Sequence, residues 1–195
     1  MPSAELPSRI RAALTTLAKW LETEKIPHAI IGGIAVSLLT EPRATQDIDL
    51  TIWPEDVTVA DLLITAESFG LISRIDNPLE FAIQARILLL KDRKTGVSVD
   101  LALGALPFEK DMIDNSEIIM LGSVRLRIAR PEDLIISKAV PMRPADLADI
   151  DKLLTFYPSV NFQRIRALVG EFQTLLDRPE YLQKLDELLE RHTQN

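Results

Sequence analysis

The stretch Asp47-Ile-Asp49-Leu-Thr-Ile constrains the fold of this chain more than any other segment. Alternate residues of a β-strand point to the same side of the sheet. The alternation therefore predicts a strand over residues 47–53, with both carboxylates on one face and the aliphatic side chains in a core on the other. Two neighbouring carboxylates repel each other unless one is protonated or a cation bridges them. Mg²⁺ is a suitable bridge, because it prefers oxygen ligands.

Two consecutive glycines, Gly32 and Gly33, lie before this strand, separated from it by the 13 residues 34–46. They follow a short β-rich run over residues 28–31 and precede an apolar, helix-like segment over residues 34–39. We therefore expect a turn here, and a turn without side chains lets the backbone approach phosphate groups closely. Together with the two carboxylates, this turn indicates metal-dependent chemistry on a nucleoside triphosphate.

A third carboxylate, Asp100, lies in the second arm of a predicted β-hairpin. The arms, residues 86–91 and 97–103, flank the sequence Asp-Arg-Lys-Thr-Gly, which is typical of a hairpin loop. Asp100 is on the polar face of its arm. If this arm lies beside the strand over 47–53, three carboxylates meet at one edge of the sheet, as two-metal phosphoryl transfer requires. The alternative is that each Asp is a solvated residue on the polar face of a half-buried strand.

The rest of the chain predicts an α/β unit followed by helices alone. In the N-terminal part we expect helices over residues 8–25, 56–69, 78–85 and 107–114, and strands over 117–121 and 123–128. In the C-terminal part we expect one helix that begins at Pro131 and three more over residues 144–156, 161–176 and 179–192. The predicted organisation is an α/β (α+β) core over residues 1–128 and a helical region over residues 129–195 packed on it.

Composition excludes several classes of protein. The chain has no cysteine, which excludes disulfides and cysteine nucleophiles, and 47% of its residues are hydrophobic, which argues against disorder. No apolar run reaches the roughly 18 residues of a membrane span, and no export signal is evident, so we expect a cytoplasmic protein with no membrane partner. The net charge of −7 argues against a broad nucleic-acid-binding surface but leaves room for a local basic face.

The glycine pair, the 13-residue gap, the Asp47-Ile-Asp49 strand and the later strand Asp100 resemble the nucleotidyltransferase superfamily typified by DNA polymerase β. The run Arg43-Ala-Thr45-Gln-Asp47 resembles more narrowly the AbiEii/AbiGii-type bacterial nucleotidyltransferases, which are toxin components of toxin–antitoxin pairs.

The later part of the chain is similar to the same group. Lys138 lies on the first predicted helix after the strands, and Asp146 and Asp149 lie together on the next. Members of this group typically carry a lysine and a paired-Asp segment at these places.

The resemblance implies a nucleotidyltransferase fold, in which helices flank a short mixed β-sheet and a C-terminal helical cap follows. The implied reaction is Mg²⁺-dependent transfer of a nucleoside monophosphate from an NTP to an acceptor hydroxyl, with release of pyrophosphate. The implied acceptor is RNA, such as a tRNA 3′ end, and the implied protein partner is a cognate antitoxin. Two alternatives stay open, namely transfer to a small molecule or a protein, and a non-catalytic role in binding a nucleotide or a partner.

The resemblance also implies roles for single residues. Three carboxylates, Asp47, Asp49 and Asp100, would hold two Mg²⁺ ions. Asp100 would also help to activate the acceptor hydroxyl. The residues that would contact the nucleotide or its phosphates are Gly32, Gly33, Arg43, Thr45 and Lys138. Asp146 and Asp149 are weaker candidates, because an Asp in the first turn of a helix also stabilises the helix dipole.

Four basic residues are candidate RNA contacts. Arg125 and Arg127 alternate on one predicted strand and share a face, and Arg93 and Lys94 lie at the predicted hairpin tip. A solvated sheet face is the alternative. The two histidines are too far apart in sequence to have the spacing of metal ligands.

Overall fold

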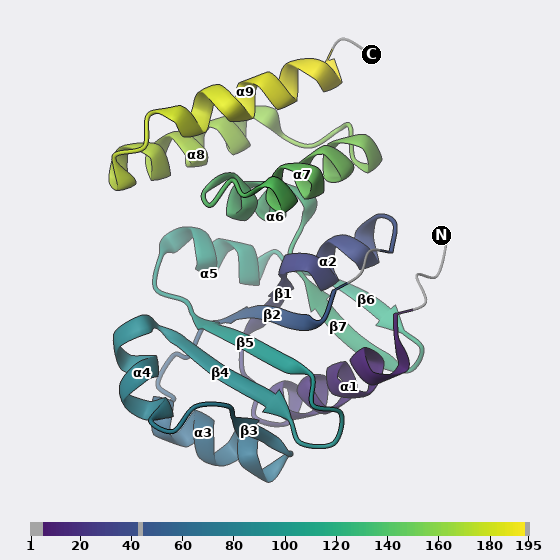
Figure 1. Cartoon of the computed structure of the whole chain (residues 1–195), viewed down its shortest axis with the longest axis vertical. Helices are drawn as coiled ribbons and strands as arrows, with labels where there is room; N and C mark the ends of the chain where they lie inside the picture. The colour runs from purple at the N-terminus through teal and green to yellow at the C-terminus, as the bar shows by residue number, and fades with distance from the viewer. Residues whose placement is uncertain (1–5, 43–44, 194–195) are drawn as a thin grey trace. The chain divides into compact units, whose positions relative to one another are not determined.

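The computed structural model describes residues 6–42 and 45–193. Packing divides the chain into two compact units: the first consists of Met1–Ser37 and Pro42–Ala129, and the second of Leu38–Glu41 and Arg130–Asn195. All described strands belong to the first unit, whereas the second is helical (Figure 1). A functional division into residues 1–128 and 129–195 stays a prediction of the sequence.

A mixed sheet forms the framework of the first unit. Its seven described strands lie in the order β3, β4, β5, β2, β1, β7, β6. β2 is parallel to β5 and β1 is parallel to β7, whereas the other neighbours are antiparallel. The strands are His28–Ile31 (β1), Asp47–Ile52 (β2), Leu71–Ser73 (β3), Ile87–Asp92 (β4), Ser98–Leu103 (β5), Glu117–Leu121 (β6) and Val124–Ile128 (β7).

The alternation of β2 and β5 is confirmed by burial. Ile48, Leu50 and Ile52 of β2 have no solvent exposure, and Val99 and Leu101 of β5 are equally buried. Burial of one such side chain stabilises the fold by about 1.5–3 kcal/mol. The aliphatic face therefore fixes which side of each strand presents its acidic residues.

The helices of the first unit are α1 (Ser8–Thr23), the first part of α2 (Gly32–Leu39), α3 (Val59–Ser68), α4 (Pro78–Ala85) and α5 (Pro107–Asp114). α1 buries Ile10, Leu14, Leu17 and Leu21, which follow the helical spacing predicted from the sequence. Trp20 is fully buried as well, and its Nε1 donates a hydrogen bond to Thr65 Oγ1 at 3.0 Å. This bond ties α1 to α3.

The second unit contains α6 (Pro131–Ala139), α7 (Pro144–Phe156), α8 (Phe162–Leu176) and α9 (Glu180–Thr193). α6 packs against α7 and α8, and α8 packs against α9. Asp133 of α6 is completely buried and pairs with Arg164 of α8 at 2.7 Å and with Arg130 at 3.2 Å. This buried ion pair links α6 to α8.

The structure confirms the predicted class, a mixed sheet flanked by helices, and differs from the prediction in several details. β3 was not expected, because three residues are too few to show an alternating pattern. α3 begins at Val59 and not at residue 56, because Thr58 caps it by accepting a hydrogen bond from the Asp61 N–H at 3.1 Å. Within residues 6–42 and 45–193, no helix is both long enough and apolar enough to span a membrane.

Candidate active site

Three carboxylates of the predicted site lie on one face of the sheet. The parallel register of β2 and β5 places Asp49 opposite Asp100, and Asp47 opposite Ser98. Residues paired in this way on neighbouring strands point to the same face. The structure therefore places the hairpin arm with Asp100 directly beside the strand with Asp47 and Asp49. This neighbourhood is what the three carboxylates require in order to lie together at one edge of the sheet.

Gly32 lies directly against Asp49. β1 is antiparallel to β2 with Ile31 opposite Asp49, so the residue after Ile31 passes beside the carboxylate. Gly32 has a φ of +66°, and a Cβ built on it would lie 2.1 Å from Oδ2 and 2.7 Å from Cβ of Asp49. The backbone conformation and the lack of space each require glycine at this position.

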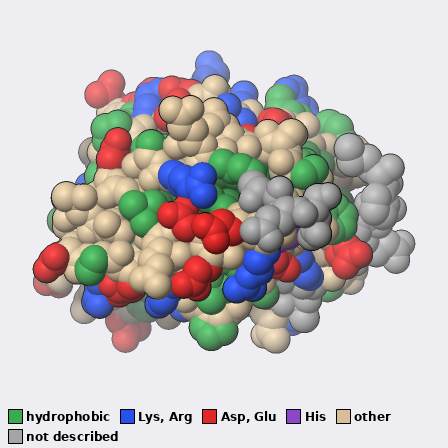
Figure 2. Space-filling model, turned by 90° about the horizontal axis from the view of Figure 1, so that it is seen from above, with side chains coloured by type: hydrophobic (Ala, Val, Ile, Leu, Met, Phe, Trp, Pro, Cys, Tyr) green, Lys and Arg blue, Asp and Glu red, His purple; other side chains and the backbone are tan. Residues whose placement is uncertain are grey.

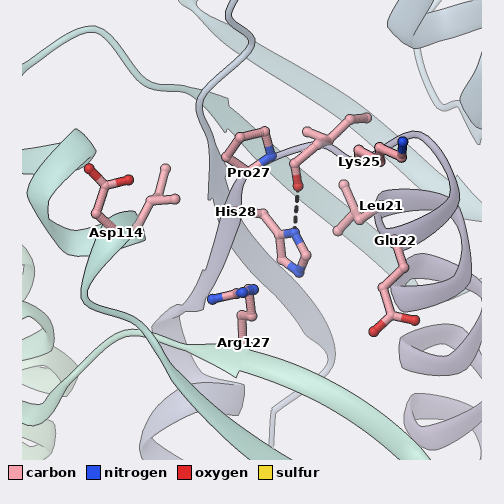
Figure 3. A pocket seen from close by; sticks show the side chains of 9 residues that line it. Leu21, Glu22, Lys25, Pro27, His28, Asp114 and Arg127 are labelled. Atoms are coloured by element: carbon pink, nitrogen blue, oxygen red, sulfur yellow. Dashed lines mark hydrogen bonds between the residues drawn. The ribbon is translucent and has the colours of Figure 1, made fainter.

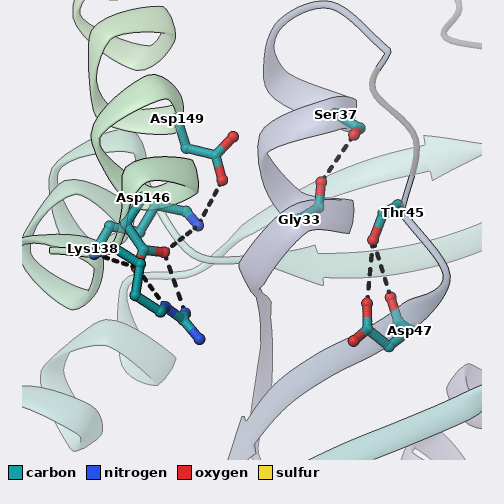
Figure 4. A network of polar contacts seen from close by, with 8 residues as sticks. Gly33, Ser37, Thr45, Asp47, Lys138, Asp146 and Asp149 are labelled. Atoms are coloured by element: carbon teal, nitrogen blue, oxygen red, sulfur yellow. Dashed lines mark hydrogen bonds and ion pairs between the residues drawn. The ribbon is translucent and has the colours of Figure 1, made fainter. Parts of the chain in front are cut away.

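The glycine pair opens a helix. Gly32 and Gly33 are the first two residues of α2, whereas the sequence predicted a turn before a helix over 34–39. Ser37 Oγ donates a hydrogen bond to the Gly33 carbonyl at 2.8 Å within this helix (Figure 4). Backbone N–H groups in the first turn of a helix have no partner inside it and attract anions. The start of α2 beside Asp49 therefore has the geometry of a phosphate cradle.

Thr45 contacts the first carboxylate of the set. Its Oγ1 lies 3.3 Å from Asp47 Oδ1 and 3.4 Å from the Asp47 carbonyl oxygen (Figure 4). Asp47 is otherwise exposed, so these long hydrogen bonds help to orient it. Arg43, also predicted to act near the nucleotide, lies outside the described residues.

Arg74 was not predicted, and it binds Asp100. Its guanidinium Nη2 donates to Asp100 Oδ1, and the two side chains are 30% and 28% exposed. The Arg74 N–H donates to the Leu89 carbonyl at 3.0 Å, and Leu89 lies opposite Asp100 in the sheet. Only the pairing of β3 with β4 brings residues 74 and 100 together, so no local pattern in the sequence indicates this contact.

The donor set fits a hard cation in its chemistry. All three carboxylates offer oxygen, the ligand type that Mg²⁺ prefers. Across the described ranges, no three His, Cys, Asp or Glu side chains are arranged as ligands of one ion. Asp100 binds Arg74 through Oδ1, which leaves its second carboxylate oxygen as a candidate metal ligand.

Lys138 lies in the second unit, in a network with Asp146 and Asp149. Its Nζ is 2.7 Å from Asp149 Oδ2 and 3.5 Å from Asp146 Oδ1 (Figure 4). The lysine side chain is 9% exposed and each aspartate side chain 3%. A buried charge without a partner costs several kcal/mol, so these opposite charges compensate one another. The sequence indicated the three residues but not their mutual pairing.

Arg143 completes this network at the start of α7. Asp146 Oδ2 accepts hydrogen bonds from Arg143 Nε at 2.7 Å and from the Arg143 backbone N–H at 3.1 Å. Burial by itself raises the pKa of Asp146, but the hydrogen bonds from Arg143 and the charge of Lys138 outweigh it. The pKa of Asp146 therefore lies below its ordinary value of 3.8.

The predicted basic residues lie on two separate parts of the first unit. Arg125 and Arg127 are exposed on β7, opposite Met120 and Ile118 of β6. Arg93 follows β4, and its Nη2 donates to Glu67 at 3.0 Å. On the face shown in Figure 2, Lys and Arg side chains are interspersed with acidic ones, and a group of acidic side chains lies near its centre.

Three solved structures share this fold. The antibiotic-resistance factor ANT(2'')-Ia superimposes with a TM-score of 0.61 at 16% identity, over 90% of this chain and 97% of that one. An antigenic nucleotidyltransferase-like protein from Paracoccidioides brasiliensis gives 0.59 at 18% identity, over 97% and 95% of the two chains. The lincosamide antibiotic adenylyltransferase LnuA, bound to lincomycin, gives 0.55 at 16% identity, over 74% and 96%. No curated protein matches the chain significantly.

A protein family matches most of the chain. Residues 10–185 match the family described as "Nucleotidyl transferase of unknown function (DUF2204)". This match spans both units, including the Asp47–Asp49 strand, Asp100 and Lys138. The shared fold of the solved structures agrees with it. The chain therefore belongs to this nucleotidyl transferase family and is an enzyme of the nucleotidyltransferase class.

Proposed function

We propose that the protein transfers a nucleoside monophosphate from an NTP to an acceptor hydroxyl in a Mg²⁺-dependent reaction. The observation that carries this proposal is the register of β2 and β5, which sets Asp49 opposite Asp100 and beside the glycine-led start of α2. Carboxylates next to a phosphate cradle suit this chemistry, because a metal and backbone amides can share the charge of the triphosphate.

In this proposal Asp47, Asp49 and Asp100 hold the Mg²⁺ ions. A bound metal would supply Lewis-acid stabilisation of the charge that develops on the phosphate oxygens. The acceptor oxygen forms a bond to the α-phosphorus while the bond from that phosphorus to the bridging oxygen breaks, and pyrophosphate leaves. Asp100 orients the acceptor hydroxyl and helps to remove its proton.

The remaining roles concern the nucleotide. The N–H groups of Gly32 and Gly33 bind phosphate oxygens, and Thr45 keeps Asp47 oriented toward the metal. Phosphate contact by Lys138 and nucleotide contact by Arg43 are proposals taken from the family resemblance.

For the acceptor we propose RNA, such as a tRNA 3′ end, with the protein acting as an AbiEii-type toxin whose partner is a cognate antitoxin. The run over residues 43–49 and the residues Lys138, Asp146 and Asp149 support this proposal. Arg125 and Arg127, both exposed on β7, offer two phosphate contacts. Acceptor binding through phosphates weakens steeply as salt rises.

A small-molecule acceptor is the second candidate. Two structures with this fold are an antibiotic-resistance factor and a lincomycin-bound lincosamide adenylyltransferase. The net charge of −7 favours a cationic small molecule over RNA, because long-range repulsion slows the approach of a polyanion. Modest dependence of acceptor binding on salt would distinguish this candidate from RNA.

The experiment is label transfer from each α-³²P-labelled NTP, with Mg²⁺, to total cellular RNA and, separately, to aminoglycoside and lincosamide antibiotics. The double variant Asp47→Asn/Asp49→Asn is the inactive control. Asp56→Asn, which removes one exposed carboxylate outside the proposed set, is the matched control. Label on a discrete RNA band, absent with the double variant, supports the RNA proposal, and label on an antibiotic supports the second candidate. Normal NTP binding without transfer to RNA, antibiotic or protein contradicts both.

A further inference from the structure

A pocket of about 390 Å³ lies at the start of β1, within the first unit (Figure 3). The end of α1, the segment that leads into β1, the end of α5 and β7 form its walls. His28 lies opposite Ile52, whereas Ile31 lies opposite Asp49, so this pocket is at the other end of β1 from the proposed active site. Its volume is in the range of small-molecule sites.

His28 presents an unpartnered nitrogen to this pocket. The residue is only 6% exposed, and its Nδ1 lies 2.8 Å from the Ile26 carbonyl oxygen. A carbonyl can only accept, so Nδ1 carries the proton, and in the neutral ring Nε2 is left as an acceptor. Within the described part of the chain Nε2 has no hydrogen-bond partner, and Figure 3 shows the far side of the His28 ring facing the space between Arg127 and Glu22.

The ring is neutral near pH 7. Burial lowers the pKa of His28 from its ordinary value of 6.5, and the nearby charge of Arg127 lowers it further against the smaller, opposite effect of Glu22. Nε2 is not one of the buried side-chain atoms without a partner in the described part of the chain, so a ligand in the pocket can reach it and donate a hydrogen bond to it.

Two opposite charges stand on either side of the imidazole. Among the residues that the structure describes, neither Glu22 nor Arg127 forms an ion pair, and the one hydrogen bond of the Arg127 guanidinium goes to Ser116 Oγ at 3.5 Å. Lys25 and Asp114 also line the pocket, so its charged side chains balance, and Asp114 is already paired with Lys110 at 2.6 Å. The apolar part of the wall is formed by Leu21, Ile26, Pro27 and Ile113.

We infer that this pocket binds a small zwitterion of the free amino acid type with an apolar side chain. The ligand carboxylate pairs with the Arg127 guanidinium, whose fork suits two parallel hydrogen bonds. The ligand ammonium donates to Glu22 and to Nε2 of His28, and the apolar side chain packs against Leu21 and Ile113. This binding goes beyond nucleotidyl transfer and does not depend on it.

The test measures binding of free leucine and phenylalanine to the purified full chain, by the ¹⁵N resonance of His28 Nε2 and by isothermal titration calorimetry. The N-acetyl forms lack the ammonium group, and the C-terminal amides lack the carboxylate. We expect the free amino acids to shift the Nε2 resonance, and each blocked form to bind about tenfold or more weakly, the size of one charged hydrogen bond.

Variants assign the contacts. Glu22→Gln and Arg127→Gln change exposed side chains, so the fold should persist, and each should weaken binding of the free amino acids by about tenfold or more. Glu24→Gln and Arg125→Gln make the same charge changes outside this pocket and should bind as the wild type does. Equal binding of N-acetyl and free forms would overturn the inference in favour of a simple carboxylate. An unchanged Nε2 resonance with every free amino acid would overturn it altogether.

Discussion

Arg74 and Asp100 form an ion pair across β4, at the carboxylate that the proposed metal site requires. The Arg74 guanidinium binds one oxygen of this carboxylate, which leaves the other oxygen for a metal ion but offsets part of the negative charge. Arg74 therefore competes with a metal ion for the charge of Asp100.

Replacing Arg74 tests this competition. Arg74→Gln frees Asp100 and is expected to tighten Mn²⁺ binding about fivefold, which corresponds to a partly exposed ion pair of about 1 kcal/mol. The affinity is measured without nucleotide by electron paramagnetic resonance of free Mn²⁺. Arg93→Gln, which removes the ion pair with Glu67, is the control. If Arg74→Gln binds Mn²⁺ no better than the wild type, Arg74 does not weaken metal binding at Asp100.

Gly32→Ala is expected to lower both stability and NTP affinity. The left-handed backbone at residue 32 costs an alanine about 1–2 kcal/mol, and its Cβ would also collide with the Asp49 carboxylate. Gly122→Ala separates the two effects, because Gly122 has a φ of +62° but no atom within 4 Å of an added Cβ. Chemical denaturation should show a smaller loss for Gly122→Ala, and only Gly32→Ala should lose NTP affinity. Equal losses in both variants would exclude a role for the contact with Asp49.

Lys138→Met is expected to destabilise the protein by roughly 3–5 kcal/mol, because it removes a buried cation from beside Asp149 and Asp146, although Asp146 keeps its contact with Arg143. Lys184→Met, at an exposed position of α9, should cost little. Adding Asp149→Asn to Lys138→Met should recover part of the loss, since it removes one of the negative charges that Lys138 compensates. Urea denaturation measures all three. Loss of NTP affinity with unchanged stability would instead assign Lys138 to phosphate binding alone.

Stability should fall as the pH drops below 6.5. Burial lowers the pKa of His28, so the unfolded chain takes up a proton at a pH where the folded chain resists it. The free energy of unfolding then decreases by at most about 1.4 kcal/mol per pH unit. The carboxylates with lowered pKa, Asp92 and Asp146, lose their stabilising contribution only as the pH falls below 3.8.

His28→Asn isolates the histidine, because its amide can still donate to the Ile26 carbonyl. Urea denaturation between about pH 7.5 and 5 should show a slope for the wild type that this variant lacks. The same slope in both proteins would assign it to other groups.

The carboxylate face could be predicted from sequence because it depends on local periodicity. Alternation alone places Asp47 and Asp49 on one face, and it places Asp100 on the polar face of its own strand. The sequence does not show whether these two strands are neighbours, because their pairing joins residues about 50 positions apart.

Two other features could not be predicted from local sequence patterns. Arg74 reaches Asp100 because a three-residue strand pairs with β4, and so short a strand has no detectable periodicity. Lys138, Asp146 and Asp149 were noticed as charges on helices, but their burial depends on how α6 packs against α7. How two helices pack depends on side chains throughout the core. The residue pattern of one helix does not determine it.

The strand β1 connects the pocket beside His28 to the proposed active site. It has four residues and lies hydrogen-bonded between β2 and β7, with His28 at one end and the residue before Gly32 at the other. At about 3.3 Å per residue, some 13 Å of backbone separate the histidine from the glycine. If an amino acid bound beside His28 changes NTP affinity by some factor, NTP changes amino acid affinity by the same factor. The NTP affinity of such an enzyme would then depend on the free amino acid concentration around it.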